Sequence, residues 1–92
     1  MTSYLAEIRR RLQANLQVPD DARRMRLGGT VVVRFRVRID GRLDDGTLTV
    51  LQPAAMTSLD RSAVEAVQRS LPLPPPPAGA AVIEVPVVFT IR

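Results

Sequence analysis

The segment that decides the fold is GGTVVVRFRVRIDG, residues 28–41. Its side chains alternate with a period of two, which places one set on each face of a β-strand. The set expected to face the core is Val31, Val33, Phe35, Val37 and Ile39, and the set expected to face solvent is Thr30, Val32, Arg34, Arg36 and Arg38. We therefore predict a strand over residues 30–39 with one buried face and one wet, basic face, closed by the turn Asp40-Gly41.

A second apolar segment, VIEVPVVFTIR, ends the chain and predicts a strand over residues 82–91. The side chains expected to face inward are Ile83, Val85, Val87, Phe89 and Ile91. Pro86 belongs to the other set, and in a strand the side chains and the hydrogen-bonding groups alternate in direction with the same parity. Because proline lacks an N–H, its backbone must face a side without a neighbouring strand. We predict that this is an edge strand whose even-numbered residues face the empty side.

The N-terminal third of the chain carries two helix signals. Apolar residues recur at helical spacing over residues 4–16, and Ser3 is placed to cap this helix. A second, short helix is expected over residues 19–27, with Pro19 and two acidic residues in its first turn. Gly28 is expected to end that helix.

The middle of the chain predicts a hairpin followed by a longer helix. Residues 40–46 form a loop rich in Gly and Asp, and a short strand over residues 47–51 follows it. Apolar spacing predicts a helix over residues 58–71 with Ser58 as its N-cap. The proline-rich segment 73–77 is expected to be an extended connector to the last strand.

These elements predict one α+β domain over residues 1–92, built from two layers. A strand–helix–strand connection favours parallel strands, so strands 47–51 and 82–91 are expected to run in parallel. Strand 30–39 then lies between them and is antiparallel to both. The expected sheet is three-stranded and antiparallel, with order 2-1-3 and the helices packed on one face.

The residues that most enzymes need are missing from this sequence. It has no His and no Cys, so a serine nucleophile would lack its usual basic partner. Asp40, Asp44 and Asp45 cluster, but their spacing does not match a calcium loop and is typical of turn-forming residues. No stretch approaches the roughly 20 apolar residues that a membrane-spanning helix needs. We expect neither catalysis nor a cofactor nor a bound metal.

The basic character of the chain raises nucleic acid as an alternative partner. All 13 basic residues are Arg, and the formal net charge is +4. Arg34, Arg36 and Arg38 form a row on the predicted open face of the sheet, as an electrostatic footprint would require. Sheet-type readers of nucleic acid also use exposed aromatic residues, and neither long strand has one facing outward. We therefore expect a solvated face, with Glu84 paired across strands to one of these arginines, and no nucleic acid partner; a basic nucleic-acid-binding module remains the less favoured alternative.

The predicted edge is the strongest functional signal in the sequence. An exposed edge strand can accept an extended peptide, whose main chain supplies affinity and whose side chains supply selectivity. The residues expected to take part are Val82, Glu84, Val85, Pro86, Val87, Val88 and Thr90. Two other arrangements remain open, in which the N-terminal helix covers the edge or a second copy of the chain pairs with it in a homodimer.

Several segments, taken in order, resemble the C-terminal domain of the TonB family of energy transducers. The matching residues are Tyr4-Leu5, Ile8-Arg9, Pro19, Ala22-Arg23, Gly29 to Phe35, Asp40 to Arg42, Leu59-Asp60, Ala63, Ala66-Val67, Pro74 to Pro77 and Val85 to Phe89. The resemblance covers nearly the whole chain and implies a two-layer α+β domain with a three-stranded antiparallel sheet, in agreement with the prediction from the residues themselves.

This resemblance also implies a function in the cell envelope. The chain would be the periplasmic domain of an inner-membrane-anchored protein linked to an ExbB–ExbD proton-driven motor. Its partner would be the TonB box of an outer-membrane receptor that imports a substrate such as an iron siderophore, and the box would add as a strand to the edge at residues 82–91. A TolA-like scaffold domain is a related alternative, although TolA usually carries a disulfide that this chain cannot form.

Secondary contacts with the receptor are expected at two places outside the edge. One is Val18-Pro19, where some family members have an aromatic residue before the proline and this chain has Val. The other is the arginine row formed by Arg34, Arg36 and Arg38.

Overall fold

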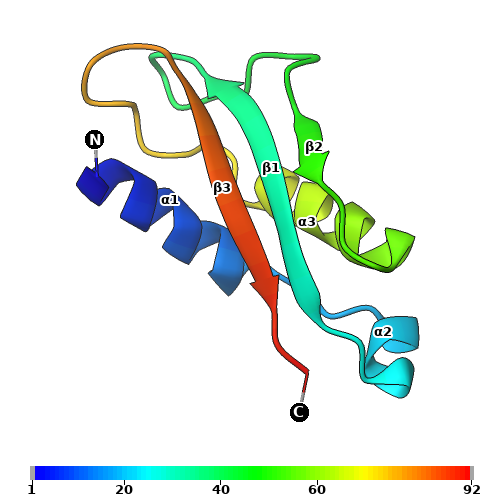
Figure 1. Ribbon diagram of the computed structural model, residues 1–92. Helices are drawn as coiled ribbons and strands as arrows, with labels where there is room; N and C mark the ends of the chain where they lie inside the picture. Colours follow the sequence, from blue (N-terminus) through cyan, green and yellow to red (C-terminus); the bar gives the residue numbers. More distant parts are fainter. Residues whose placement is uncertain (1, 92) are drawn as a thin grey trace.

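The computed structural model describes residues 2–91 and contains three helices and three strands in that range. The elements in chain order are α1 (Thr2–Ala14), α2 (Asp20–Met25), β1 (Gly29–Val37), β2 (Thr49–Gln52), α3 (Thr57–Arg69) and β3 (Ala81–Phe89). Figure 1 shows the two long strands side by side, with α1 and α3 behind them and α2 at the end of the sheet where the C-terminus lies.

The three strands form one sheet with order β2-β1-β3, and β1 is antiparallel to both neighbours. Val33, in the centre of β1, lies opposite Val50 on one side and Val85 on the other. An irregularity between β1 and β2 leaves Leu51 as an extra residue on the shorter strand, because Val32 pairs with Gln52. The predicted fold class and strand order are therefore confirmed.

The core lies between the sheet and the two longer helices. Apart from the first residue of each strand, the odd-numbered residues of β1 and β3 are buried, as the alternation predicts: Val31, Val33, Phe35, Val37, Ile83, Val85, Val87 and Phe89. The helices contribute Ile8 and Leu12 from α1 and Leu59, Ala63 and Val67 from α3. Burying each large aliphatic or aromatic side chain contributes about 1.5–3 kcal/mol, so this layer supplies most of the stabilisation.

Both predicted serine caps are wrong. Ser3 lies inside α1, which begins at Thr2, and Ser58 lies inside α3, whose N-cap position is Met56. The Ser58 hydroxyl is buried and has no hydrogen-bond partner among the described residues. Asp60 supplies the side-chain contact at this end of α3, because its carboxylate accepts a hydrogen bond from the Ala54 N–H at 2.8 Å. The contact to the loop before α3 thus comes from Asp60, inside the helix, and not from Ser58.

The expected stop of the second helix is also wrong. Arg26, and not Gly28, takes the left-handed conformation (φ 54°) that ends α2. The N–H of Arg26 donates to the Arg23 carbonyl at 3.2 Å and the N–H of Leu27 donates to the Ala22 carbonyl at 3.0 Å, which is the Schellman arrangement. Gly28 is constrained by the sheet instead, because a Cβ atom there would lie 2.4 Å from the carbonyl oxygen of Phe89.

The predicted burial of Ile39 is wrong, since its side chain is 71% exposed. β1 ends at Val37, and the chain then turns, with the Arg38 N–H donating to the Arg42 carbonyl at 2.8 Å. The alternation of a strand cannot continue through this turn, so Ile39 leaves the core face. Ile91 lies beyond the end of β3 and is only half-buried.

Gly41 brings this turn against the proline-rich connector. Its φ of 86° favours glycine, and its carbonyl accepts a hydrogen bond from the Leu73 N–H at 2.9 Å. A Cβ atom at Gly41 would lie 1.8 Å from the Leu73 carbonyl oxygen, whereas one at Gly46, where φ is 79°, would meet nothing within 4 Å. At Gly41 the turn and the connector therefore meet backbone to backbone.

Substitution of these two glycines distinguishes the cost of a left-handed backbone from the cost of a steric collision, because both have a positive φ and only Gly41 has a close neighbour. Gly46→Ala should lower the free energy of unfolding by about 1–2 kcal/mol, the cost of a left-handed conformation for an L-residue. Gly41→Ala carries the same strain and also collides with the Leu73 backbone, so we expect a loss of at least about 3 kcal/mol. Urea unfolding of the two variants measures the difference, and equal losses would show that the contact with Leu73 is unimportant.

Candidate functional site

The candidate site is the free side of β3, which has β1 as its only sheet neighbour among the described residues. Pro86 lies opposite Val32 and has no N–H, so this is a non-hydrogen-bonded pair. In an antiparallel ladder the pairs on either side, Val31–Val87 and Val33–Val85, then exchange the hydrogen bonds. The backbone groups of the even-numbered residues of β3 consequently point away from the sheet, as the sequence predicts.

The predicted edge residues separate into two groups by exposure. Val85 and Val87 are buried, so they contribute to the core and present no side chain at the edge. Val82 and Val88 are 60% and 44% exposed and present apolar side chains at the edge. Glu84 is also exposed, Pro86 is half-buried, and Thr90 is exposed but lies beyond the end of the strand.

One residue that the sequence analysis did not single out occupies part of this edge. The Val88 N–H donates to Oε1 of Gln13 at 2.8 Å, and Nε2 of Gln13 donates to the Val88 carbonyl at 3.2 Å. The two residues are 75 positions apart in the chain. Gln13 is an exposed polar residue on an amphipathic helix, so no local pattern distinguishes it from an ordinary solvent-facing side chain.

A hollow of about 250 Å³ lies between α1 and the first half of the edge. Its lining residues are Leu5, Ala6, Arg9, Glu84, Val85 and Pro86. Its wall on α1 combines an apolar stretch with the cation of Arg9, which forms no ion pair with any described residue. The hollow can accept an apolar side chain beside an anionic or polar group.

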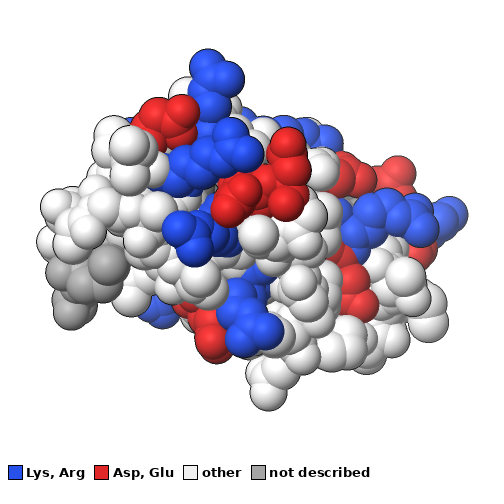
Figure 2. Space-filling model, turned by 90° about the horizontal axis from the view of Figure 1, so that it is seen from above, with Lys and Arg blue, Asp and Glu red and all other residues white. Residues whose placement is uncertain are grey.

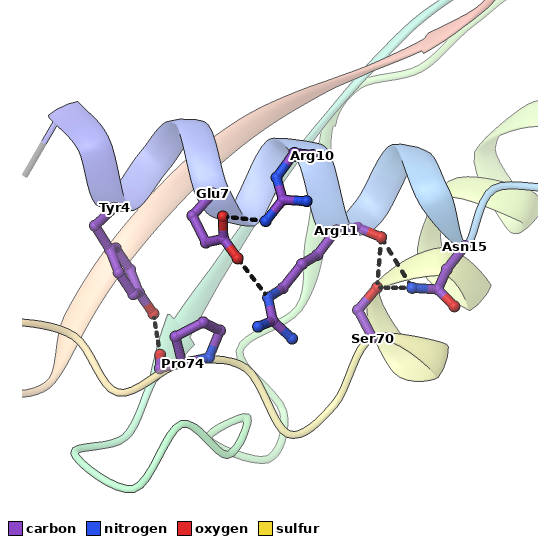
Figure 3. A network of polar contacts seen from close by, with 7 residues as sticks. All are labelled: Tyr4, Glu7, Arg10, Arg11, Asn15, Ser70 and Pro74. Atoms are coloured by element: carbon purple, nitrogen blue, oxygen red, sulfur yellow. Dashed lines mark hydrogen bonds and ion pairs between the residues drawn. The ribbon is translucent and has the colours of Figure 1, made fainter.

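Polar contacts at both ends fix α1 in place (Figure 3). Near the start, the hydroxyl of Tyr4 donates to the Pro74 carbonyl at 2.9 Å. Near the end, the side-chain amide of Asn15 donates to the Arg11 carbonyl at 2.9 Å and to the hydroxyl of Ser70 at 3.1 Å. The helix is thereby attached to the connector and to the end of α3, which fixes its position beside β3.

The charged groups on the outer side of α1 form a local cluster. Glu7 pairs with Arg10 and with Arg11, the latter at 3.0 Å, and both interactions are exposed. Hydrogen bonds from Arg10 and Arg11 lower the pKa of the Glu7 carboxyl, and the carboxylate raises the pKa of Arg10. Exposed pairs of this kind contribute little to stability, so the apolar contacts and the two end anchors hold the helix.

The arginine row lies on the outer face of the sheet. Asp44 pairs with two of its members, with Arg36 at 3.4 Å and Arg38 at 3.5 Å. Arg34 lies directly across from Glu84, but no ion pair joins their side chains, so the expected cross-strand pair is absent within residues 2–91. Figure 2 looks onto the end of the sheet that lies at the top of Figure 1, and it shows blue and red groups interspersed there, an arrangement that is poorly suited to a polyanion.

The other predicted secondary contact lies closer to the edge. Val18 lines a hollow of about 290 Å³ together with Arg23, Thr90 and Ile91, just beyond the end of β3. Pro19 is half-buried and immediately precedes α2. The structure thus brings Val18 to the C-terminal end of the edge, whereas the arginine row is on a separate face.

Two carboxylates of the β1–β2 loop, those of Asp40 and Asp44, bind groups of the loop and of the neighbouring end of β1. Asp44 forms the ion pairs with Arg36 and Arg38, and the Asp40 carboxylate accepts the Arg42 N–H at 3.0 Å. Across residues 2–91, no three His, Cys, Asp or Glu side chains gather in a way that would hold a metal ion. In the same range, no helix combines the length and the apolar character needed to cross a bilayer.

Comparison with known sequences identifies one family. The family described as Gram-negative bacterial TonB protein C-terminal matches residues 14–91. Protein TonB of Haemophilus ducreyi is 33% identical over 94 residues, and Protein TonB of Haemophilus influenzae is 31% identical over 93 residues. Each match covers 100% of this chain but only 33% and 34% of the relatives, so the chain spans about a third of their length.

Solved structures show the same fold. Two solution structures of the Helicobacter pylori TonB-CTD have TM-scores of 0.79 and 0.82 at 22% identity, and they cover 97% and 100% of this chain and 95% and 84% of their own. HasB CTD has a TM-score of 0.60 at 32% identity, covering 97% of this chain and 70% of its own. The arrangement of sheet and helices is therefore shared with known TonB C-terminal domains.

The anchor at the start of α1 can be tested through the ionisation of Tyr4. Burial raises the pKa of its phenol above the ordinary value of 10.0. A raised pKa contributes stability that is fully present below the unfolded value and is lost as the pH rises through the folded value. Tyr4 is the only tyrosine and the chain has no Trp. Tyrosinate absorbance should therefore titrate above pH 10.0 in the folded chain and return to the ordinary value in urea. An ordinary value in the folded chain would contradict the burial of this phenol.

The direction of the β3 backbone can be tested at Pro86. Pro86→Ala adds an N–H that should point out of the sheet, so we expect a change in unfolding free energy within about 1 kcal/mol. In an amide-exchange experiment on this variant, the newly introduced amide should exchange rapidly while the amides of Val85 and Val87 stay protected. As a control, Val85→Pro removes a bond to β1 and should cost about 2 kcal/mol or more. If the introduced amide were as protected as that of Val85, the even-numbered residues of β3 would be the ones that pair with β1, contrary to the arrangement described above.

Proposed function

The chain belongs to the TonB C-terminal domain family, and from this membership we propose that it is a non-enzymatic periplasmic module that binds outer-membrane receptors. The receptor segment would be an extended peptide, the TonB box, added as a strand to the free side of β3. The observation that carries the proposal is the outward direction of the even-numbered backbone groups of this edge strand, which follows from the pairing of Pro86 with Val32.

Strand addition is a suitable mode of binding for this edge. Glu84 and Val82 offer both a donor and an acceptor, and Pro86 offers its carbonyl alone. Each main-chain hydrogen bond contributes about 0.5–1.5 kcal/mol net, so a short run of them supplies a useful affinity with little demand on the peptide sequence. Selectivity must then come from side chains on either face of the added strand.

The hollow beside α1 supports the side-chain part of this proposal. Successive side chains of an added strand point alternately toward α1 and toward solvent. Those that point toward α1 would enter the hollow lined by Leu5, Ala6 and Arg9. Val18, which lines the hollow beyond the end of β3, would make a secondary contact at the far end of the peptide. The arginine row would contact only parts of the receptor that extend over the outer face of the sheet.

The role in energy transfer rests on the relatives and on the length of the match. This chain corresponds to about a third of each relative, so we propose that it is the receptor-contacting part of a longer protein. The remainder would supply the inner-membrane anchor and the link to an ExbB–ExbD motor that uses the proton-motive force. The family match and the TonB relatives favour this role over a TolA-like scaffold. Active import, such as that of an iron siderophore, would be the process it serves.

The proposed mode of binding is tested by two substitutions at one edge position. Glu84→Pro removes the outward N–H of this residue. The strand already holds a proline at another even-numbered position, Pro86, so we expect the extended backbone to be kept. Glu84→Ala removes the same side chain but keeps the N–H. The ligand is a synthetic peptide from the N-terminal periplasmic segment of an outer-membrane receptor encoded in the same genome. Binding is followed by amide chemical shifts.

We expect shifts concentrated along β3 for the unaltered chain and for Glu84→Ala. Glu84→Pro should weaken binding about tenfold or more, because a carbonyl of the peptide loses its partner. Amide spectra of both variants establish that the fold is retained. Equal affinity for the two variants would rule out pairing along this edge, and shifts confined to the arginine row would indicate a different surface.

A further inference from the structure

The contact between Gln13 and Val88 has the hydrogen-bonding pattern of a strand pair. In an antiparallel ladder, a residue of a hydrogen-bonded pair gives its N–H and receives at its C=O from the same partner. The side-chain amide of Gln13 presents an acceptor and a donor side by side, and it uses both on Val88, at 2.8 and 3.2 Å. One side chain therefore reproduces at Val88 what an added strand would supply.

The amide is held in position by the helix that carries it. Leu12, the preceding residue, is fully buried, and Asn15 two positions later is bonded to Ser70. The backbone of Gln13 therefore cannot move without disturbing the core. Its side chain is exposed, however, and it has rotatable bonds, so the amide can leave Val88 while α1 stays in place.

This contact divides the edge into an open part and an occupied part. Val82 and Glu84 have outward donors and acceptors with no side-chain partner among the described residues, and Glu84 borders the hollow beside α1. Pro86 has no donor to offer. Val88, the last outward residue of the strand, has both its groups bonded to Gln13.

We propose that Gln13 is a displaceable gate on the edge, which competes with the incoming peptide for the backbone of Val88. The proposal rests on the proposed function, because the competitor is the same added strand. A peptide pairs first along Glu84, where the edge is open, and reaches Val88 only by replacing the Gln13 amide. Gln13 thereby lowers the affinity for every peptide that extends as far as Val88, whereas a peptide that ends before Val88 does not compete with it.

A merely structural role makes a different prediction. If Gln13 only attaches α1 to β3, its removal lowers stability and leaves the affinity of the folded chain unchanged or weaker. If it is a competitor, removal of the amide exposes Val88 and strengthens binding. Affinity and stability therefore move in opposite directions only when Gln13 acts as a gate.

The test uses Gln13→Ala, Gln13→Met and a matched control. Met has nearly the length of Gln and lacks its amide, so it separates the hydrogen bonds from the bulk of the side chain. Gln68→Ala is the control, because Gln68 is also an exposed helical glutamine and its side chain has no hydrogen-bond partner in residues 2–91. Peptide affinity is measured by calorimetry with the receptor segment described above, and the exchange of the Val88 amide is followed in the free chain.

Both Gln13 variants should bind the peptide roughly three- to tenfold more tightly, since two exposed hydrogen bonds no longer have to be broken. The Val88 amide should exchange faster in both, and Gln68→Ala should match the unaltered chain. Faster exchange with unchanged or weaker binding would overturn the gate but not the proposed function. Unchanged exchange would show that the contact is absent in solution and would also overturn the gate. A failure of every variant to bind, the unaltered chain included, would overturn the proposed function and the gate with it.

Discussion

The shared parity of side chains and hydrogen-bonding groups in β3, with which Pro86 is compatible in one direction only, is the constraint on which the arrangement of this domain depends. Because Pro86 cannot donate to β1, the odd-numbered residues of β3 must form the ladder, and the same residues direct their side chains into the core. A shift of one residue would expose Val85 and Val87, bury Glu84 and turn the proline toward β1. Register, core and free edge thus have one common cause.

Under the proposed function, the edge must be available to a partner and yet protected from unwanted pairing. Exposed strand edges invite association with other chains, and Val82 and Val88 add apolar surface to this one. Pro86 removes a donor, Glu84 adds a charge, and Gln13 occupies the backbone of Val88. These three features reduce self-pairing without closing the whole edge. The sequence left open whether the N-terminal helix covers this edge. In the structure, α1 forms hydrogen bonds with the backbone of one residue of the strand, Val88.

The sequence predicted the sheet correctly and the ends of its elements less well. Period-two alternation in β1 and β3 reports burial directly, because one face of the sheet is covered by helices. The errors at Ser58 and Gly28 lie at helix ends, where several residues can satisfy the same backbone groups. Asp60 reaches back to Ala54 where a serine cap was expected, and Arg26 ends α2 in the left-handed conformation while Gly28 lies against Phe89.

The sequence by itself determined the strand order and the free side of β3, because alternation and the chemistry of proline are properties of the chain alone. It also carried the resemblance to the TonB family, through the order of its segments. Only the tertiary structure decided that Gln13 meets Val88 and that Gly41 meets Leu73. Those contacts join residues far apart in the chain, and they depend on how α1 and the connector pack against the sheet. A local pattern records which face of an element is buried, but not which distant group arrives at its edge.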